Sequence, residues 1–307
     1  MNHSIPRKPS LRSRSYTGAG PFTRRSAVAS ICAALLAGAV PPAAASGTGP
    51  HRTAERGPAP LRRAHAHNDY AHDRPLRDAL DHGFGSVEAD VWLVDGRLLV
   101  AHEEAELDPR RTLEALYLDP LRSLVAANGG TVFKDHPLSL QLLVDLKTAG
   151  APAYQELARR LRPYAPMLSV CAAGRVRTRA VTAVVSGDRG ARAPMAAERV
   201  RRAFYDGRLT DLGTAAPATF IPLVSANWSE RFRWVGAGPM PAAERAELHR
   251  IVAAAHGEGR RLRFWATPDA PGPERDAVWR ELLAAGVDHL NTDDLAGLER
   301  FLRAAGR

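Results

Sequence analysis

Three pairs of ionisable side chains two residues apart each lie within or directly after an apolar run. The three pairs are His65 and His67, Glu88 and Asp90, and Asp145 and Lys147. Side chains two residues apart in a β-strand point to the same face. A further histidine, His102, closes the apolar run 98–101. If these strands are neighbours, imidazoles, carboxylates and one ammonium group meet in a single site.

The acidic pairs follow segments that are apolar on both faces. Residues 84–87 precede Glu88 and residues 140–144 precede Asp145, as in strands that are buried on both sides. Carboxylates near such a core need a partner. A divalent cation shared by Glu88, Asp90 and Asp145 would supply one, and a site made only of oxygen ligands favours Mg²⁺ or Ca²⁺.

This combination of groups suits the hydrolysis of a phosphodiester. A metal ion and the ammonium of Lys147 neutralise charge on the phosphoryl oxygens, and two histidines supply a base for the nucleophile and an acid for the leaving group. Lysine is rare here: among 42 basic residues it occurs only at positions 8, 134 and 147. Its presence at 147 indicates a position where an ammonium group is needed.

The elements that must position these groups alternate along the chain. The apolar runs predict strands at 62–67, 85–91 with 97–101, 139–146, 180–185, 202–206, 218–225, 261–266 and 287–291. Helical patterns lie near 75–82, 112–127, 153–162, 194–200, 241–257, 274–285 and 295–305. This order predicts one α/β domain, a single (β/α)8 TIM-type barrel over 61–307, whose strands converge at their C-terminal ends. Residues 168–179 predict a small inserted hairpin. A doubly wound sheet is the alternative, but the chain lacks a Gly-rich first turn.

The first 45 residues have the composition of a secretory signal peptide. They contain six basic residues and no acid, an apolar run at 27–40 and the small residues 43–46. The pair Arg24 and Arg25 suggests the twin-arginine route, although the usual hydrophobic residues do not follow it. Residues 46–60 predict a flexible linker. We therefore expect a secreted protein of the extracellular space or the cell envelope.

Charge and cysteine content restrict the partners. Removal of the leader lowers the formal net charge from +9 to +3, without a dense basic block, so nucleic acid is not an expected partner. No apolar run is long enough for a transmembrane helix. Cys32 would leave with the leader, and Cys171 remains as a single thiol that we expect to be buried. Transient contact with a membrane surface is compatible with a lipid substrate, and nothing requires an oligomer, so a monomer is expected.

Several motifs together resemble the superfamily of glycerophosphodiester phosphodiesterases and phosphatidylinositol-specific phospholipases C. They are the segments 64–70 (AHAHNDY), 86–92 (SVEADVW), 99–103 (LVAHE), 143–147 (LVDLK), 264–267 (FWAT) and 286–293 (GVDHLNTD). The His-Asn-Asp-Tyr start is most similar to the subgroup called altered inheritance of mitochondria protein 6. The resemblance covers roughly residues 62–305.

The resemblance implies a TIM-type barrel that holds one divalent cation on Glu88, Asp90 and Asp145. His102 would be one catalytic imidazole, and His65 or His67 the other. Lys147, Asn68 and Trp265 would contact the substrate, a glycerophosphodiester or a phospholipid-type diester. In that superfamily a hydroxyl of the substrate often attacks first and gives a cyclic phosphodiester.

Two departures leave questions open. The His-Arg-Gly start of the glycerophosphodiesterases is missing, and Asp145 stands where glutamate is commoner. Of the two histidines at the first strand, we prefer His67 as the catalytic one because Asn68 is adjacent; His65 would then be a hydrogen-bonding or metal-side neighbour. Asp293 is interpreted either as a supporting group of the site or as an ordinary surface acid.

Two other functions are compatible with parts of this sequence. A His-x-His pair ending a first strand is also typical of amidohydrolase and PHP-type metal hydrolases, but those need further histidines on later strands, and none is near Asp206 or Ser225. A non-catalytic secreted barrel is the other alternative, and the full set of charged groups argues against it. Trp228 and Trp234 flank an Arg-rich loop, where packing is favoured over a lipid-facing rim.

Overall fold

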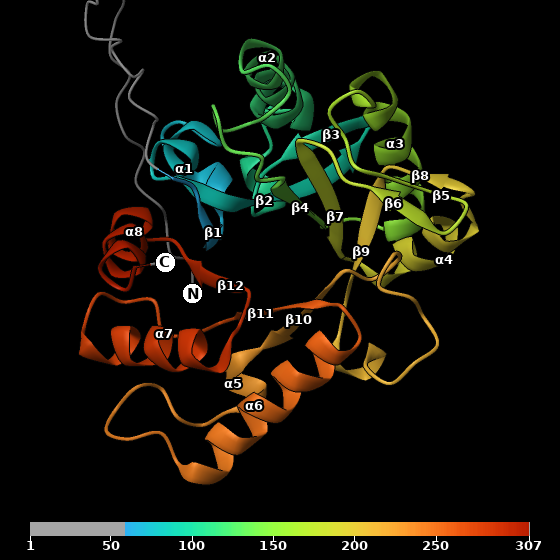
Figure 1. The fold of residues 1–307 in the computed structure, drawn as a ribbon. Helices are drawn as coiled ribbons and strands as arrows, with labels where there is room; N and C mark the ends of the chain where they lie inside the picture. Colours follow the sequence, from blue (N-terminus) through green and yellow to red (C-terminus); the bar gives the residue numbers. More distant parts are fainter. Residues whose placement is uncertain (1–58, 307) are drawn as a thin grey trace, which may run out of the picture. The chain divides into compact units, whose positions relative to one another are not determined.

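A computed structural model describes residues 59–306, and these residues form a closed ring of parallel strands with helices around it (Figure 1). The ring contains β1 (Leu61–Ala66), β2 (Phe84–Val94), β4 (Leu140–Leu146), β7 (Val181–Gly187), β9 (Ala203–Gly207), β10 (Leu223–Asn227), β11 (Arg261–Trp265) and β12 (His289–Thr292). Each strand pairs in parallel with the next, and β1 pairs with both β12 and β2, which closes the ring. The predicted TIM-type barrel is confirmed.

The helices follow the strands near the predicted positions, except that the short helix Trp228–Arg231 was not predicted and the helix predicted at 194–200 ends at Ala197. They are α1 (Arg77–Asp81), α2 (Asp119–Ala127), α3 (Gly150–Leu161), α4 (Arg192–Ala197), α5 (Trp228–Arg231), α6 (Ala242–Gly257), α7 (Pro273–Ala285) and α8 (Leu295–Ala304). After β9 the described chain has only a single 3₁₀ turn, Leu209–Asp211, before β10. Proline at the first position of α7 and Gly286 in left-handed conformation after it mark that helix at both ends. No helix among the described residues is both long and apolar enough to span a membrane.

One antiparallel strand and one short separate sheet extend the barrel. The strand β3 (Arg97–Val100) is antiparallel to the far end of β2, so β2 continues to Val94 and Glu88 and Asp90 lie within it, not at its end. The predicted hairpin is confirmed as β5 (Val170–Ala172) and β6 (Arg175–Arg177), and β8 (Val200–Arg201) adds a third strand that the sequence did not predict.

The apolar core lies between the strands and the surrounding helices. Strand β4 is almost completely buried along its length, as expected for a parallel strand covered on both sides. Trp228 is fully buried and Trp234 is 8% exposed, so their loop packs inward as predicted. Cys171 is buried, also as predicted. The predicted leader (1–45) and almost all of the linker (46–60) lie outside the described residues.

Candidate active site

Parallel strands bring the predicted residues to one end of the barrel. His67 follows β1, Asp90 lies in β2, and Asp145 and Lys147 lie at the end of β4. In the parallel register of β2 and β4, Asp90 and Asp145 are direct partners. Because all these strands run in the same direction, their C-terminal ends form one mouth.

His67 is oriented by a carboxylate from the opposite end of the sequence. Its Nδ1 lies 2.9 Å from Oδ1 of Asp293, directly after β12. The Asn68 amide donates to both oxygens of the same carboxylate at 3.3 Å. Burial alone would lower the pKa of His67, but the hydrogen bond to Asp293 and the negative charges of Glu88 and Asp293 together outweigh it and raise this pKa. A proton held on Nδ1 by Asp293 leaves Nε2, which has no partner among the described residues, for proton transfer.

His102 is oriented in the same way by a second carboxylate. Its Nδ1 lies 3.1 Å from Oδ2 of Asp90, which is 1% exposed. The imidazole itself is about half exposed, and its Nε2 lies 3.6 Å from the Glu103 carboxylate. The mouth therefore contains two histidine–carboxylate pairs, each with Nδ1 on the acid and Nε2 directed elsewhere.

Tyr70 connects the two pairs. Its hydroxyl lies 2.6 Å from Oδ2 of Asp90, 2.7 Å from Oδ1 of Asn68 and 3.1 Å from Nδ1 of His102. Burial, followed by the hydrogen bond to Asp90, raises the pKa of Tyr70 far above its ordinary value. The phenol therefore stays protonated and acts as a donor. Asn68 adopts the left-handed conformation, φ 47°, which turns its amide toward both partners.

Lys147 neutralises two of the predicted metal ligands. Its Nζ lies 2.9 Å from Oδ2 of Asp90 and 3.1 Å from Oδ1 of Asp145. Burial alone would lower the pKa of Lys147, but the two carboxylates outweigh it and raise this pKa. The ammonium is about one quarter exposed, so it is charged and within reach of a bound anion.

His65 lies beneath the mouth and is fully buried. Its Nδ1 lies 2.7 Å from the Ser86 hydroxyl and its Nε2 lies 3.0 Å from Oε2 of Glu88. Burial, and next the charge of Arg263, lower the pKa of His65 to about 4. The imidazole is therefore neutral at pH 7 and has both nitrogens engaged. This placement suits the hydrogen-bonding neighbour that the sequence left open for His65, whereas the side chain of His67 is 30% exposed. The catalytic role of His67 stays a prediction.

Glu88 has a cation of the protein as its partner. Arg263, from β11, donates through Nη1 to Oε2 of Glu88 at 2.5 Å, and both residues are buried. Burial alone would raise the pKa of Glu88, but the Arg263 charge and the His65 hydrogen bond outweigh it and hold this pKa below its usual range. Sequence reasoning missed Arg263, although its position between Arg261 and Trp265 on one face of a strand is a signal for an inward polar residue.

The donor chemistry of the three predicted ligands fits a divalent cation only in part. Each carboxylate uses one oxygen for an arginine or lysine, and Oδ1 of Asp90 is buried without any partner. That unpartnered oxygen is what a cation would satisfy. Within residues 59–306, however, no group of three or more His, Cys, Asp or Glu side chains is already arranged around a common point. The metal therefore stays a prediction, and so does a zinc shared by His65 and His67.

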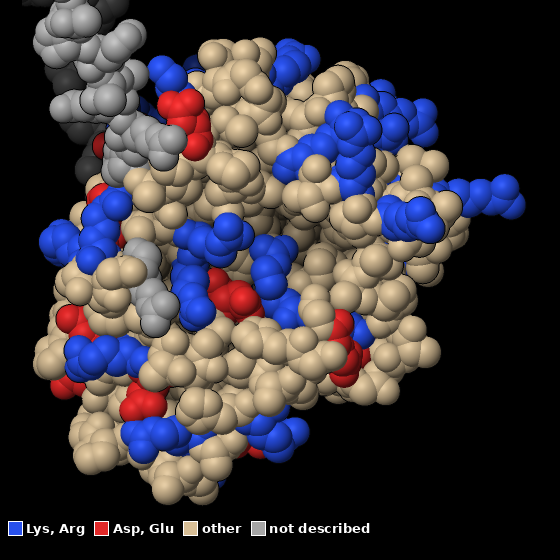
Figure 2. All heavy atoms as spheres, viewed as in Figure 1, with Lys and Arg blue, Asp and Glu red and all other residues tan. Residues whose placement is uncertain are grey.

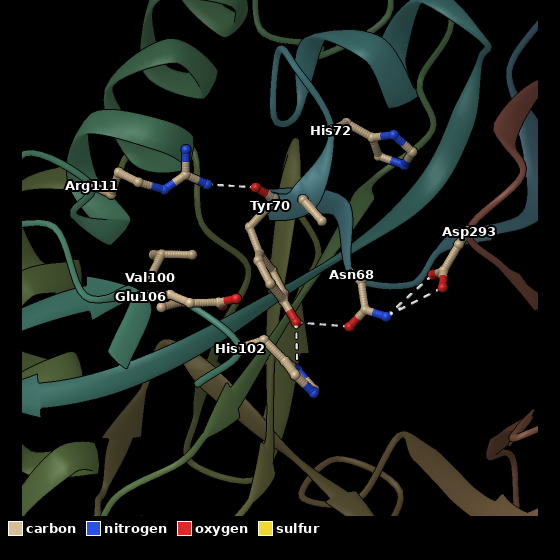
Figure 3. Close-up of a pocket in the computed structure, with 10 residues that line it drawn as sticks. Asn68, Tyr70, His72, Val100, His102, Glu106, Arg111 and Asp293 are labelled. Carbon is tan, nitrogen blue, oxygen red and sulfur yellow. Dashed lines mark hydrogen bonds between the residues drawn. The ribbon is translucent and has the colours of Figure 1, made fainter. Parts of the chain in front are cut away.

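A pocket of about 640 Å³ opens beside the second pair (Figure 3). Asn68, Tyr70, His102 and Asp293 line it from the mouth, and Arg111 and Glu106 line it farther out. Figure 3 shows the hydrogen bonds from the Tyr70 hydroxyl to Asn68 and His102, and those from Asn68 to Asp293. The pocket is thus continuous with the groups that connect both histidines.

Asp293 and Trp265, which the sequence analysis considered for the site, both lie near this mouth. Asp293 joins the site through His67 and Asn68, so of its two interpretations the supporting role is the one that the geometry favours. Trp265 ends β11 and is partly buried, on the same strand face as Arg263. Its predicted contact with substrate stays a prediction. Tyr70 was present in the motif 64–70, but its bridging role depends on contacts that the sequence does not reveal.

Comparison with known proteins identifies relatives of the whole barrel. Residues 55–206 match the AIM6-like phosphodiesterase domain, and residues 261–296 match the glycerophosphoryl diester phosphodiesterase family. The chain is 32% identical over 270 residues to altered inheritance of mitochondria protein 6 of Eremothecium gossypii, covering 78% of this chain and 69% of that protein. It is 29% identical over 254 residues to a homolog from Arthroderma benhamiae, covering 75% and 81%.

Two solved structures align with the chain at lower similarity. A Ca²⁺-dependent phosphatidylinositol-specific phospholipase C from Streptomyces antibioticus aligns with a TM-score of 0.48 and 14% identity, covering 78% of this chain and 95% of that one. A glycerophosphoryl diester phosphodiesterase from Parabacteroides distasonis aligns with a TM-score of 0.44 and 12% identity, covering 80% and 87%.

Proposed function

This chain belongs to the AIM6-like phosphodiesterase family, and from that premise we propose that it hydrolyses phosphoric diesters with His67 and His102 as its acid and base. The observation that carries the proposal is the presence of two histidine–carboxylate pairs at one mouth, each with its Nδ1 on the acid. A phosphodiester needs one proton removed from its nucleophile and one delivered to its leaving alkoxide, and two separate imidazoles supply both.

The remaining groups of the mouth either bind the phosphate or orient the two histidines. The Lys147 ammonium attracts the phosphoryl oxygens and stabilises the charge that develops on them. The Asn68 amide and the Tyr70 hydroxyl keep both histidines oriented. In each histidine the proton held on Nδ1 by the carboxylate makes Nε2 the atom that exchanges protons with the substrate. We propose a glycerophosphodiester or phospholipid-type diester as substrate, and a barrel that acts as a monomer.

A divalent cation is part of this proposal. Glu88, Asp90 and Asp145 would hold Mg²⁺ or Ca²⁺, which when bound would neutralise charge on the phosphate. The unpartnered Oδ1 of Asp90 supports it. Calorimetric titration of either ion into the metal-free chain should give one site, and Asp145→Asn should weaken binding at least tenfold. Absence of binding to the wild type would remove the cation from the proposal.

The activity is tested with a panel of glycerophosphodiesters, lysophospholipids and phosphoinositol lipids, with and without EDTA. We expect cleavage of at least one phosphodiester, and a rate lower by about 10²–10⁴-fold in His67→Asn and in His102→Asn. The control is His82→Asn, because His82 pairs with Glu299 outside the mouth. Wild-type turnover in both mouth variants would contradict the assignment. Absence of cleavage together with co-purified zinc would favour a His-x-His metal hydrolase.

Export is proposed on the leader alone. The basic, then apolar, then small-residue order of residues 1–45 supports secretion to the extracellular space or the cell envelope. Mass spectrometry of the protein recovered from the native host should find a mature chain that begins near residue 46. Recovery of the intact leader from the cytoplasm would contradict this.

A further inference from the structure

One buried arginine has no acidic partner. In the described part of the chain, four arginines are buried, each with at most 6% of its surface exposed. Three of them pair with acids: Arg260 with Glu258, Arg263 with Glu88, and Arg275 with Asp294. The fourth, Arg201, is 6% exposed, and no carboxylate of residues 59–306 lies within 4.0 Å of its nitrogens. A buried charge without a counter-ion is costly.

The groups that contact Arg201 satisfy it only in part. Its Nη2 donates to the carbonyl oxygen of Thr219 at 2.8 Å. The guanidinium lies 4.8 Å from the centroid of the Phe220 ring and 5.7 Å from that of Phe204, and such contacts offset some of the cost of burial. Its Nε is buried and has no hydrogen-bond partner. The guanidinium therefore still has donor capacity for an anion.

Arg201 lines a cavity of about 700 Å³. Apolar side chains form much of its wall: Cys171, Ala172, Ala196, Pro217, Phe220 and Val200. Val200, at the rim of the cavity, is 49% exposed. The lining segments precede β7, β9 and β10, so the cavity lies at the N-terminal ends of the strands, opposite the mouth that contains His67 and His102.

The charges around this cavity favour an anion. Besides Arg201, the charged residues that line it are Arg199, which is exposed, and Glu198. The carboxylate of Glu198 accepts a hydrogen bond from the Tyr154 hydroxyl, so it has its own partner. Basic side chains also gather over the β5–β6–β8 sheet and α3 on the face seen in Figure 2. An incoming anion meets a net positive surface before it reaches Arg201.

We propose that this cavity is a second binding site, specific for an anionic amphiphile. The acidic head group pairs with the guanidinium of Arg201, and the apolar chain lies along Phe220, Val200 and the wall around Cys171. This site is independent of the mouth and does not depend on the proposed hydrolysis. A bound anionic amphiphile would pair with the buried charge of Arg201 and would cover both the apolar wall and the exposed Val200 at the rim.

The first experiment compares two probes with the same chain length and different head groups, the anionic dodecanoate and the neutral dodecanol, below the concentration at which dodecanoate forms micelles. Calorimetry on the full chain should show one dodecanoate site and at least tenfold weaker dodecanol binding. Arg201→Met should weaken dodecanoate binding by about ten- to hundredfold, as expected for loss of a charged hydrogen bond. Arg202→Met is the matched control, because the adjacent Arg202 does not line this cavity.

Cys171 reports where the probe binds. Bound dodecanoate should slow alkylation of this thiol, measured by mass spectrometry of the peptide that contains it, and dodecanol at the same concentration should slow it much less. If Arg201→Met does not fold, Val200→Asp at the exposed rim replaces it and should also weaken dodecanoate binding. Equal binding of both probes, or dodecanoate binding that leaves Cys171 unprotected, would overturn the proposal.

Discussion

Tyr70 has one hydroxyl proton and three groups within hydrogen-bond distance, of which two are acceptors, the oxygens of Asp90 and Asn68. The carboxylate of Asp90 is the charged acceptor and lies 2.6 Å away, so it takes the proton in preference to the neutral oxygen of Asn68. His102 then donates from Nδ1, either to Asp90 or to the tyrosine oxygen. Tyr70 thereby fixes the tautomer of His102 without contacting the reacting atoms, and it acts as a positioning residue.

Asp293 sets the proton affinity of His67. Because the hydrogen bond to Asp293 raises the pKa of His67, Asp293→Asn should lower that pKa. The limb of the pH–rate profile that reports His67 should then move to lower pH. Asp294→Asn is the control, since Asp294 caps α8 and pairs with Arg275. Unchanged limbs in Asp293→Asn, with the control also unchanged, would show that Asp293 does not tune His67.

Individual elements position the site through their ends and turns. The turn between β1 and α1 is held by Asp69, whose Oδ2 accepts from the Leu76 amide at 2.6 Å and from the Tyr117 hydroxyl at 2.8 Å. Leu76 has φ 64°, a strained conformation for leucine. This carboxylate therefore holds in place the segment that carries Asn68 and Tyr70.

Asp69 makes stability depend on pH. Burial raises its pKa to about 6 from 3.8. The folded state then holds this proton more strongly than the unfolded state, so the stabilisation is complete at low pH and is lost as pH rises through the folded pKa. The free energy of unfolding of the wild type, relative to Asp69→Asn, should fall by about 2 kcal/mol from about pH 4 to about pH 7. Urea unfolding at several pH values measures it, and a constant difference would contradict it.

The end of β7 approaches the site so closely that only glycine fits. Gly187 has φ 76°, and a Cβ there would lie 2.8 Å from Oδ1 of Asp145. Gly187→Ala should therefore destabilise the fold by about 1–3 kcal/mol and displace Asp145. Gly96→Ala is the matched control, with a similar φ of 71° but open space around it. Thermal unfolding should show a larger loss for Gly187→Ala, and equal losses would argue against this close approach.

At the scale of the whole molecule, closure of the barrel brings remote strands around one buried charge. Glu88 from β2 meets His65 from β1 and Arg263 from β11, and Asn291 from β12 accepts from the same guanidinium at 3.2 Å. These four strands come from the beginning and the end of the described chain. The polar layer beneath the mouth exists only when the ring is closed.

Loss of Arg263 should therefore affect the entire barrel. Arg263→Met leaves Glu88 buried without a counter-ion, which should lower the free energy of unfolding by about 3–5 kcal/mol. The double variant Glu88→Gln with Arg263→Met removes both charges and should recover part of the loss. Urea unfolding of both variants measures the difference. A double variant less stable than Arg263→Met would mean that the charge pair is not what the barrel requires.

Local patterns in the sequence were sufficient to predict the order of the elements and several residues of the site. Alternating apolar runs predicted the strands and helices because burial imposes its period on the residues of each element. The spacing of two residues in the segments 65–67, 88–90 and 145–147 placed each pair on one face, which is also a local property. His102 and Lys147 were found by the same reasoning and Asn68 through the family resemblance, and the structure brings the three into one mouth.

The partners of those residues were decided only by the tertiary structure. Asp293 is 226 residues from His67, and Arg263 is 175 residues from Glu88. A strand's period shows which face a side chain occupies, but not which distant strand faces it. The fully buried position of His65, the neutralisation of Glu88 by an arginine and the unpaired charge of Arg201 all depend on how the closed ring distributes burial, and no local pattern carries that information.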